Sequence, residues 1–173
     1  MVRIYTLTLA PSLDSATITP QIYPEGKLRC TAPVFEPGGG GINVARAIAH
    51  LGGHATAIFP AGGATGEHLT ALLHDEQVTA ITVQTKDWTR QNLHVHVEAG
   101  GEQYRFVMPG ATLSADEFRQ LEEKVLACES GSILVISGSL PPGVEVAKLT
   151  QLIKAAQSKG LRVIVDSSGE ALA

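Results

Sequence analysis

The chain has 173 residues, a formal net charge of −4 and only 5% aromatic residues. This composition excludes the basic surface with interleaved aromatic rings that is typical of nucleic-acid-binding proteins, and no apolar run reaches the length of a membrane span. With 44% hydrophobic and 17% charged residues, the chain can fold around a compact core rather than remain disordered. We therefore expect a folded protein that binds neither nucleic acid nor membranes.

The N-terminal residues 1–10 place one charge ahead of apolar residues, as a weak signal peptide also does. Thr6 and Thr8 interrupt the apolar run and Pro11 ends it, which favours a first β-strand at 2–9. The two cysteines are far apart in sequence, which is typical of a reducing compartment and provides neither a disulfide framework nor a thiolate metal cluster. We expect a cytoplasmic protein.

Short apolar runs alternate along the chain with segments of helical periodicity. Helices are expected at 42–51, from Ser114 onward and at 144–159; the second opens with a capping-box sequence, and glycines follow the other two. This alternation predicts an α/β fold with a doubly wound, mostly parallel sheet and helices on both faces. The expected strands, whose runs suit burial on both faces, lie at 2–9, 55–59, 79–84, 132–136 and 161–165.

Two segments, at about 11–37 and 88–109, interrupt this alternation and read as β structure between a sheet strand and its expected helix. The second contains Gly100-Gly101, a pair typical of a two-residue hairpin turn. The cross-strand pairs expected from that turn are Val97 with Tyr104, Val95 with Phe106, and His96 with Arg105.

Alternation along this hairpin separates its side chains onto two faces. One face is apolar and must pack against the first interrupting segment or a second subunit, because a two-stranded ribbon cannot bury it alone. The other face is polar and is free to meet a ligand or solvent, and solvent is the simpler reading for its two histidines. The apolar face carries Leu93, Val95, Val97, Tyr104, Phe106 and Met108, and the polar face carries Arg90, Asn92, His94, His96 and Arg105.

Polar side chains and glycines follow several of the expected strands, where open α/β sheets bind their ligands. Asp14 follows the first strand, residues 137–143 follow the fourth, and Asp166 ends the last. The most informative segment is 37–43, Pro-Gly-Gly-Gly-Gly-Ile-Asn, which opens directly into a helix. Its glycines let a ligand approach the backbone, and Asn43 either reaches a hydroxyl-rich ligand or caps the helix.

Common nucleotide and metal motifs fit this sequence poorly. The glycine run lacks the third glycine of a dinucleotide fingerprint, and no GxxxxGK phosphate loop occurs. His50 and His54 have the i, i+4 spacing of a metal pair, but Gly52 and Gly53 lie between them, so one helical face is not expected.

The segment 38–47, Gly-Gly-Gly-Gly-Ile-Asn-Val-Ala-Arg-Ala, resembles the first signature of the ribokinase/PfkB family of carbohydrate kinases. Segments 89–92 and 137–143 resemble the phosphofructokinase branch, whose substrates already carry a phosphate. The likeness runs along the whole chain. It implies a ribokinase-like fold whose two interrupting segments form a small β lid, which in this family also makes the dimer contact. It further implies ATP- and Mg²⁺-dependent phosphate transfer to fructose 6-phosphate.

The resemblance also implies a sugar-phosphate site. Asp14 and Asn43 would hydrogen-bond sugar hydroxyls, and Gly38 and Gly39 would line the sugar with backbone. Arg90 would hold the phosphate that the substrate already carries, since its planar fork binds phosphate oxygens bidentately.

Four further positions follow from the same resemblance. Ser139 would lie near the substrate phosphate, and Arg105 is a weaker candidate there. Lys27 would lie on the lid and reach toward the nucleotide of a neighbouring subunit. Asp166 would lie near the ATP phosphates, or would instead cap the turn that follows it.

Several parts of the family pattern are not found in these residues: the glycine-rich turn with the catalytic aspartate, and the Asn-x-x-Glu segment that handles Mg²⁺. We therefore expect 1–173 to be the N-terminal portion of a longer, truncated domain, with 168–173 as the first turn of a helix. Two readings remain. The chain is the substrate and lid half of a phosphofructokinase, inactive alone, or it is a sugar-phosphate-binding or oligomerisation module. Tagatose 6-phosphate and fructose 1-phosphate are alternative substrates.

Overall fold

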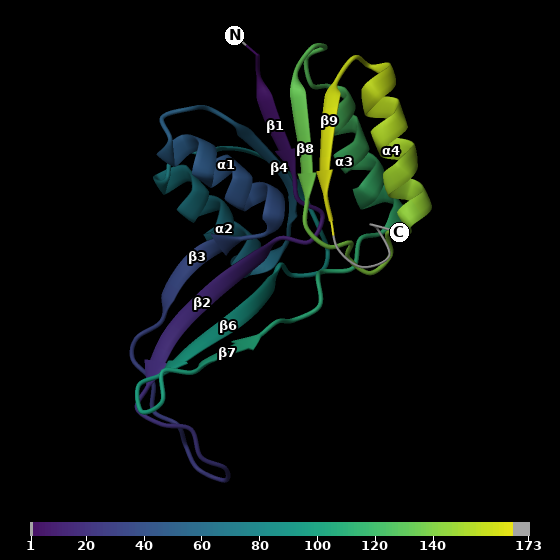
Figure 1. Cartoon of the computed structure of the whole chain (residues 1–173). Coiled ribbons are helices and arrows are strands. Elements are labelled where there is room, and N and C mark those ends of the chain that lie inside the picture. Colours follow the sequence, from purple (N-terminus) through teal and green to yellow (C-terminus); the bar gives the residue numbers. More distant parts are fainter. Residues whose placement is uncertain (1, 168–173) are drawn as a thin grey trace.

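A computed structural model describes residues 2–167, so the turn expected at 168–173 lies outside the described residues. A parallel sheet has the strand order β5-β4-β1-β8-β9 (Figure 1). Its strands are β1 (Ile4–Leu7), β4 (Thr56–Ala61), β5 (Thr79–Gln84), β8 (Ile133–Ser137) and β9 (Arg162–Asp166). The strand predicted at 79–84 agrees with β5 at both ends, and the other four differ by one or two residues at their ends.

Helices cover both faces of this sheet, which confirms the doubly wound α/β prediction. On one face, α1 and α2 enclose an apolar cluster around Ile42, Phe59 and Leu69. On the other, α3 and α4 enclose a larger cluster that includes Leu121 and Leu134. The helices are α1 (Gly40–His50), α2 (Gly63–Asp75), α3 (Ala115–Leu126) and α4 (Val146–Ser158).

The two interrupting segments build a second sheet, here called the lid, with the order β3-β2-β6-β7. It projects from the end of the parallel sheet at which β1, β8 and β9 terminate (Figure 1). Strands β2 and β6 are parallel, and β3 and β7 join them in antiparallel pairs. The lid strands are β2 (Ser12–Thr19), β3 (Val34–Gly38), β6 (Arg90–Val97) and β7 (Gln103–Phe106).

The register predicted for the β6–β7 hairpin is wrong by two residues. His94, not His96, lies opposite Arg105, and Val95 lies opposite Tyr104. The loop has four residues, because the Val97 amide donates to the Glu102 carbonyl at 2.9 Å. The Glu98 amide donates to the carbonyl of Thr19 at the end of β2, and the Ala99 amide donates to the Pro20 carbonyl, so the chain turns earlier than the glycine pair indicates. A shift of two residues leaves every side chain on its predicted face.

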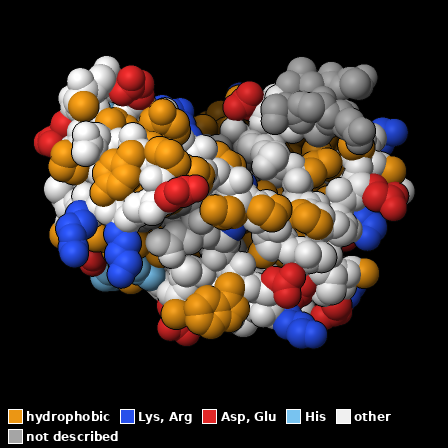
Figure 2. Space-filling view, turned by 90° about the horizontal axis from the view of Figure 1, so that it is seen from below, with side chains coloured by type: hydrophobic (Ala, Val, Ile, Leu, Met, Phe, Trp, Pro, Cys, Tyr) orange, Lys and Arg blue, Asp and Glu red, His pale blue; other side chains and the backbone are white. Residues whose placement is uncertain are grey.

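The apolar face of the lid is only partly covered. At one edge, α2 packs against β2 and β3, and the Phe35 ring lies 5.1 Å from the His68 ring. Val95 and Val97 are buried, whereas Leu93, Tyr104 and Phe106 are 36%, 43% and 47% exposed. Figure 2, seen from below, shows hydrophobic side chains at the surface of this end of the molecule, interspersed with charged ones. The lid therefore presents an apolar patch to solvent, here defined as Leu93, Tyr104, Phe106 and Met108.

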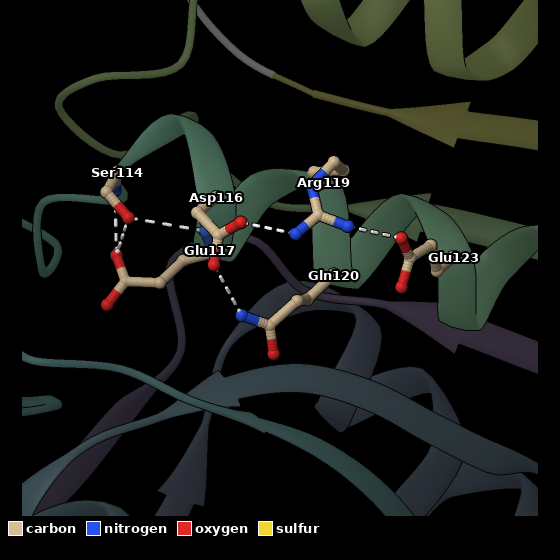
Figure 3. Close-up of polar contacts among 6 residues, drawn as sticks. All are labelled: Ser114, Asp116, Glu117, Arg119, Gln120 and Glu123. Carbon is tan, nitrogen blue, oxygen red and sulfur yellow. Dashed lines mark hydrogen bonds and ion pairs between the residues drawn. The ribbon is translucent and has the colours of Figure 1, made fainter.

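Helix α3 begins with the predicted capping box (Figure 3). The Glu117 amide donates to the Ser114 hydroxyl at 3.3 Å, and the Glu117 carboxylate accepts from the Ser114 amide at 2.7 Å. One helical turn further on, Arg119 lies between the carboxylates of Asp116 and Glu123 (Figure 3). The Lys86 amide also donates to Glu117, at 2.7 Å. The cap thus joins the start of α3 to the residues that follow β5.

Burial opposes ionisation of Glu117, but hydrogen bonds from the Ser114 and Lys86 amides outweigh it and lower the pKa of this carboxyl. A carboxyl whose pKa is lower in the folded state stabilises the fold above its unfolded pKa, and this stabilisation is lost as pH falls through the folded pKa.

No helix among residues 2–167 is long and apolar enough to cross a bilayer.

We predict that Ser114→Ala lowers the free energy of unfolding by about 1 kcal/mol, because the start of α3 loses its side-chain acceptor. Urea unfolding, followed by the fluorescence of the single tryptophan, measures the change. Ser158→Ala is the matched control: its hydroxyl donates to the Lys154 carbonyl within the last turn of α4, and its removal should cost less than about 0.5 kcal/mol. Equal losses in the two variants would contradict the capping role.

Candidate functional site

Helix α1 begins in direct contact with the ends of two central strands. The Ile42 amide donates to the Thr8 hydroxyl at 2.9 Å. A Cβ added to Gly40 would lie 2.3 Å from the Ser137 hydroxyl, and one added to Gly41 would lie 2.6 Å from the Thr8 hydroxyl. Such distances exclude any side chain at these two glycines. The glycine run therefore lets the lid strand β3 pass straight into α1 at the carboxyl end of the sheet.

Asn43 stands in the first turn of α1 and its side chain is exposed. The residue that caps the helix is Gly39, and no side-chain hydrogen bond caps this end. Of the two roles open to Asn43 in the sequence, helix capping is thus wrong. The amide of Asn43 stays available to a ligand at the start of the helix.

Asp14 lies at the base of the lid within a polar cluster. Its Oδ1 accepts from the Ser12 hydroxyl at 2.7 Å and from the Asn92 side-chain amide at 2.8 Å. A Cβ on Gly38 would lie 2.4 Å from Asp14 Oδ2, so the Gly38 backbone lies against the carboxylate. The Asn92 Oδ1 in turn accepts from the Met108 amide at 3.0 Å. These contacts orient the Asp14 carboxylate from three strands of the lid.

Asn92 is a residue that the site assignment from sequence did not include. The sequence placed it on the polar face of the hairpin, but nothing there indicated which strand this face would meet. The structure pairs β2 with β6 in parallel, with Asp14 directly opposite Asn92. A parallel pairing between segments so far apart in sequence leaves no local signal.

Arg90 is half-buried where the lid joins the parallel sheet. Its guanidinium donates to the carbonyls of Met108 at 2.7 Å, Ala10 at 2.9 Å and Pro11 at 3.4 Å. Burial lowers the pKa of Arg90, and the nearby Asp14 carboxylate opposes that shift. Arginine remains charged through such shifts. Since a guanidinium has five N–H donors, two remain for an anion after these three bonds.

Arg90 and Ser139 line the same cavity, which has a volume of about 830 Å³. The remainder of its wall comes from residues 109–110, from residues 140–142 and 144–145 of the loop after β8, and from Val146 at the start of α4. Ser139 is exposed, and it lies in the loop that leaves β8. Two residues expected near a phosphate are therefore brought to one opening between the lid and the parallel sheet.

Two other expected residues lie on the outer part of the lid. Arg105 is exposed on β7, opposite His94 on the polar face. Lys27 is exposed in the loop between β2 and β3, where the Tyr23 hydroxyl donates to the Lys27 carbonyl at 3.0 Å. Neither residue lines the cavity that contains Arg90 and Ser139.

Asp166 ends β9, and its Oδ2 accepts from the Ser137 hydroxyl at 2.9 Å across the β8–β9 pair. The residues described, 2–167, contain no group of three His, Cys, Asp or Glu side chains that would hold a metal ion. His50 lies 3.9 Å from the Glu76 carboxylate at the opposite end of α1. These side chains alone do not fit a Mg²⁺ site.

Residues 7–173 match the family described as pfkB family carbohydrate kinase. The chain belongs to this family. The glycine run, the lid and the loop after β8 are thus parts of a pfkB fold, as the sequence resemblance implied.

One pfkB relative, from Escherichia coli K12, is named ATP-dependent 6-phosphofructokinase isozyme 2 and is 85% identical over 172 residues. A crystal structure of phosphofructokinase-2 from Escherichia coli in complex with fructose-6-phosphate has a TM-score of 0.97 at 85% identity, covering 99% of this chain and 57% of that chain. Another, of its tetrameric inhibited form, has a TM-score of 0.96 with the same identity and coverage. The chain spans 56% of the length of the curated Escherichia coli relative.

We predict that Arg90→Lys lowers the free energy of unfolding by about 2 kcal/mol, because an ammonium cannot reach three separate carbonyls that a planar fork reaches together. Trp88, two residues away, reports the transition by fluorescence during urea unfolding. Arg105→Lys on exposed β7 is the matched control and should stay within about 0.5 kcal/mol. If Arg90→Lys is as stable as the control, Arg90 does not fasten the lid to the parallel sheet.

Proposed function

We propose that this chain is the substrate-binding and lid portion of an ATP-dependent 6-phosphofructokinase, and that its substrate is fructose 6-phosphate. The observation that carries the proposal is the joint placement of two groups at the carboxyl end of the parallel sheet. One is the oriented carboxylate of Asp14, and the other is the cavity lined by Arg90 and Ser139. The first suits sugar hydroxyls and the second suits a phosphate. The name of the 85% identical relative supports fructose 6-phosphate over tagatose 6-phosphate and fructose 1-phosphate.

In this proposal each part of the site has a physical task. The Asp14 carboxylate, oriented by Asn92, accepts hydrogen bonds from sugar hydroxyls, and the exposed Asn43 amide binds another hydroxyl. The Gly38–Gly39 backbone lets the sugar ring approach closely, since no Cβ intervenes. Arg90 offers its two remaining donors to the phosphate.

Three residues have secondary tasks. Ser139 adds a hydroxyl on the cavity wall beside the phosphate. Arg105 adds positive charge on the polar face of the lid. Lys27, on the exposed loop between β2 and β3, is proposed to reach the nucleotide bound by a neighbouring subunit.

We further propose that residues 1–173 bind the sugar phosphate without transferring phosphate. ATP and Mg²⁺ are implied by the family, and Asp166 would lie near the nucleotide phosphates. One carboxylate that already accepts a bond from Ser137 is a poor Mg²⁺ site, because this ion requires an octahedral set of oxygen ligands. Phosphate transfer depends on such charge stabilisation.

The lid is proposed to join copies of this chain. The apolar patch leaves four hydrophobic side chains exposed side by side on the lid, and such a patch suits a contact between two copies related by two-fold symmetry. The tetrameric form of the Escherichia coli relative supports self-association. An oligomerisation or sugar-phosphate-binding module without catalysis is therefore the second candidate function.

Both cysteines, Cys30 and Cys128, are free thiols, which supports the cytoplasm as the location.

Isothermal titration with fructose 6-phosphate tests the binding site. We expect heat of binding in the unmodified chain and an affinity about tenfold lower in Asp14→Asn, since a hydroxyl bonds a carboxylate more strongly than an amide. Asp75→Asn, on the exposed end of α2, should bind like the unmodified chain. Fructose without its phosphate should bind more weakly than the phosphate ester. No heat from a folded chain would remove the sugar-phosphate site.

An assay for ATP-dependent phosphorylation of fructose 6-phosphate tests the absence of catalysis. We expect no turnover above background in the presence of Mg²⁺. A magnesium-dependent turnover that follows the chain through purification would refute this proposal and would show that these residues complete an ATP site among themselves. Loss of that turnover in Asp14→Asn would then identify the chain, rather than a contaminant, as its source.

A further inference from the structure

Arg46 lies on α1 about one turn after Asn43, and only 19% of its side chain is exposed. Its Nε and one terminal nitrogen donate to the two carboxylate oxygens of Glu76, at 2.6 and 2.8 Å. The other terminal nitrogen donates to the Pro37 carbonyl at 3.0 Å. Each of the three guanidinium nitrogens therefore bonds the protein itself, and Arg46 joins α1 to the end of α2 and to the end of β3.

The Pro37 carbonyl belongs to the peptide group that leads into Gly38. Pro37 is buried near the end of β3, opposite Leu13 of β2. Proline has no N–H, so the backbone at this position cannot be held by donating a hydrogen bond to a neighbouring strand. A buried carbonyl needs a hydrogen-bond partner, and Arg46 provides one. The guanidinium therefore fixes the orientation of the peptide between residues 37 and 38.

This peptide adjoins the backbone that is proposed to meet the sugar. The Gly38 backbone lies against the Asp14 carboxylate, and Gly39 follows with a φ of +120°. Glycine has more conformational freedom than any other residue, so two glycines in a row do not fix their own direction. On the far side of the pair, the Gly39 carbonyl accepts from the Asn43 amide at 2.8 Å. The Gly38–Gly39 pair thus lies between two hydrogen bonds, one from the Asn43 amide and one from Arg46.

Carboxylates surround the Arg46 guanidinium and hold it in its charged form. The hydrogen bond to Glu76 raises the pKa of Arg46 more than burial lowers it, and the charges of Glu36 and Asp14 add to the rise. Glu76 directly follows α2, and 25% of its side chain is exposed. The ion pair with Glu76 uses nitrogens other than the one that bonds Pro37. It therefore anchors the guanidinium without competing for the Pro37 carbonyl.

We propose that Arg46 is a positioning residue of the sugar-phosphate site: its bond to the Pro37 carbonyl sets the Gly38–Gly39 backbone where the sugar ring binds. The inference rests on the proposed function, which supplies the ligand. In this role Arg46 contacts neither the sugar nor the phosphate. Its ion pair with Glu76 stabilises the contact between α1 and the end of α2, whereas its bond to Pro37 shapes the site. Because the two tasks use different nitrogens, substitutions can separate them.

Isothermal titration with fructose 6-phosphate compares Arg46→Ala with Glu76→Gln. Arg46→Ala removes both the ion pair and the bond to Pro37. Glu76→Gln removes the negative charge but keeps an acceptor for the guanidinium, so the bond to Pro37 remains. We expect an affinity about tenfold lower in Arg46→Ala, the effect of one lost polar contact, and an affinity within about twofold of the unmodified chain in Glu76→Gln. Urea unfolding should show that both variants are less stable than the unmodified chain.

The amide nitrogen resonance of Gly38 in NMR spectra is a readout that needs no ligand. This nitrogen shares a peptide group with the Pro37 carbonyl, so its resonance should move in Arg46→Ala and stay in place in Glu76→Gln. Arg46→Lys keeps a charge that pairs with Glu76, but an ammonium cannot reach Pro37 at the same time. It should therefore show the same Gly38 shift and the same loss of affinity as Arg46→Ala, and it serves as the test if Arg46→Ala does not fold.

Inorganic phosphate is the second ligand, because it has no sugar ring to meet the glycine backbone. Followed by NMR titration, it should bind Arg46→Lys as it binds the unmodified chain, and weaker binding would overturn a role confined to the sugar.

Unchanged affinity for fructose 6-phosphate in folded Arg46→Lys overturns the proposal, as does an unmoved Gly38 resonance. An equal loss of affinity in Glu76→Gln also overturns it, since the ion pair alone would then account for the effect. Failure of the proposed function is distinct from these results: the unmodified chain itself would bind no fructose 6-phosphate, and the inference would fall with it.

Discussion

The close contact between helix α1 and the ends of β1 and β8 is the constraint on which the rest of this molecule depends. Side chains at Gly40 or Gly41 would overlap Ser137 or Thr8, so only glycine lets the helix begin there. Because the helix begins at the strand ends, β3 passes directly from the lid into α1. That path holds the Gly38 backbone against the Asp14 carboxylate and places Asn43 at the mouth of the site.

Polar contacts hold the lid to this base, in addition to the packing of α2 against β2 and β3. Two segments connect the lid to the parallel sheet, one at residues 10–11 and the other at residue 108, and the Arg90 guanidinium donates to carbonyls of both. Asn92 accepts from the Met108 amide and donates to the Asp14 carboxylate. The same guanidinium and carboxylate are the groups proposed to bind the sugar phosphate. Under the proposed function, ligand binding and lid attachment would share these side chains, and occupancy of the site would be coupled to the position of the lid.

Much of the fold followed from the sequence because its signals are local. Apolar runs, glycine stops and the Ser114–Glu117 capping box each act within a few residues, and the elements they predict agree with the structure apart from their ends. The β6–β7 register did not follow, since the amides of residues 98 and 99 bond to the Thr19 and Pro20 carbonyls and the turn comes earlier than the glycine pair indicates. Helix α2 had a weak signal because glycines at 63 and 66 lie in its first turn. Its role as cover for the lid is a tertiary contact.

The site shows the same division. By itself the sequence determined its components: a glycine run that opens a helix, a carboxylate after the first strand, an arginine on a polar face, and a likeness to carbohydrate kinases in which these residues have sugar-phosphate roles. Only the tertiary structure decided that Asn92 orients Asp14 and that Arg90 already bonds three carbonyls. Side-chain chemistry and short-range periodicity can be recognised from neighbouring residues in the sequence. Parallel strand pairing instead joins residues nearly eighty positions apart. No local sequence pattern specifies such a pairing.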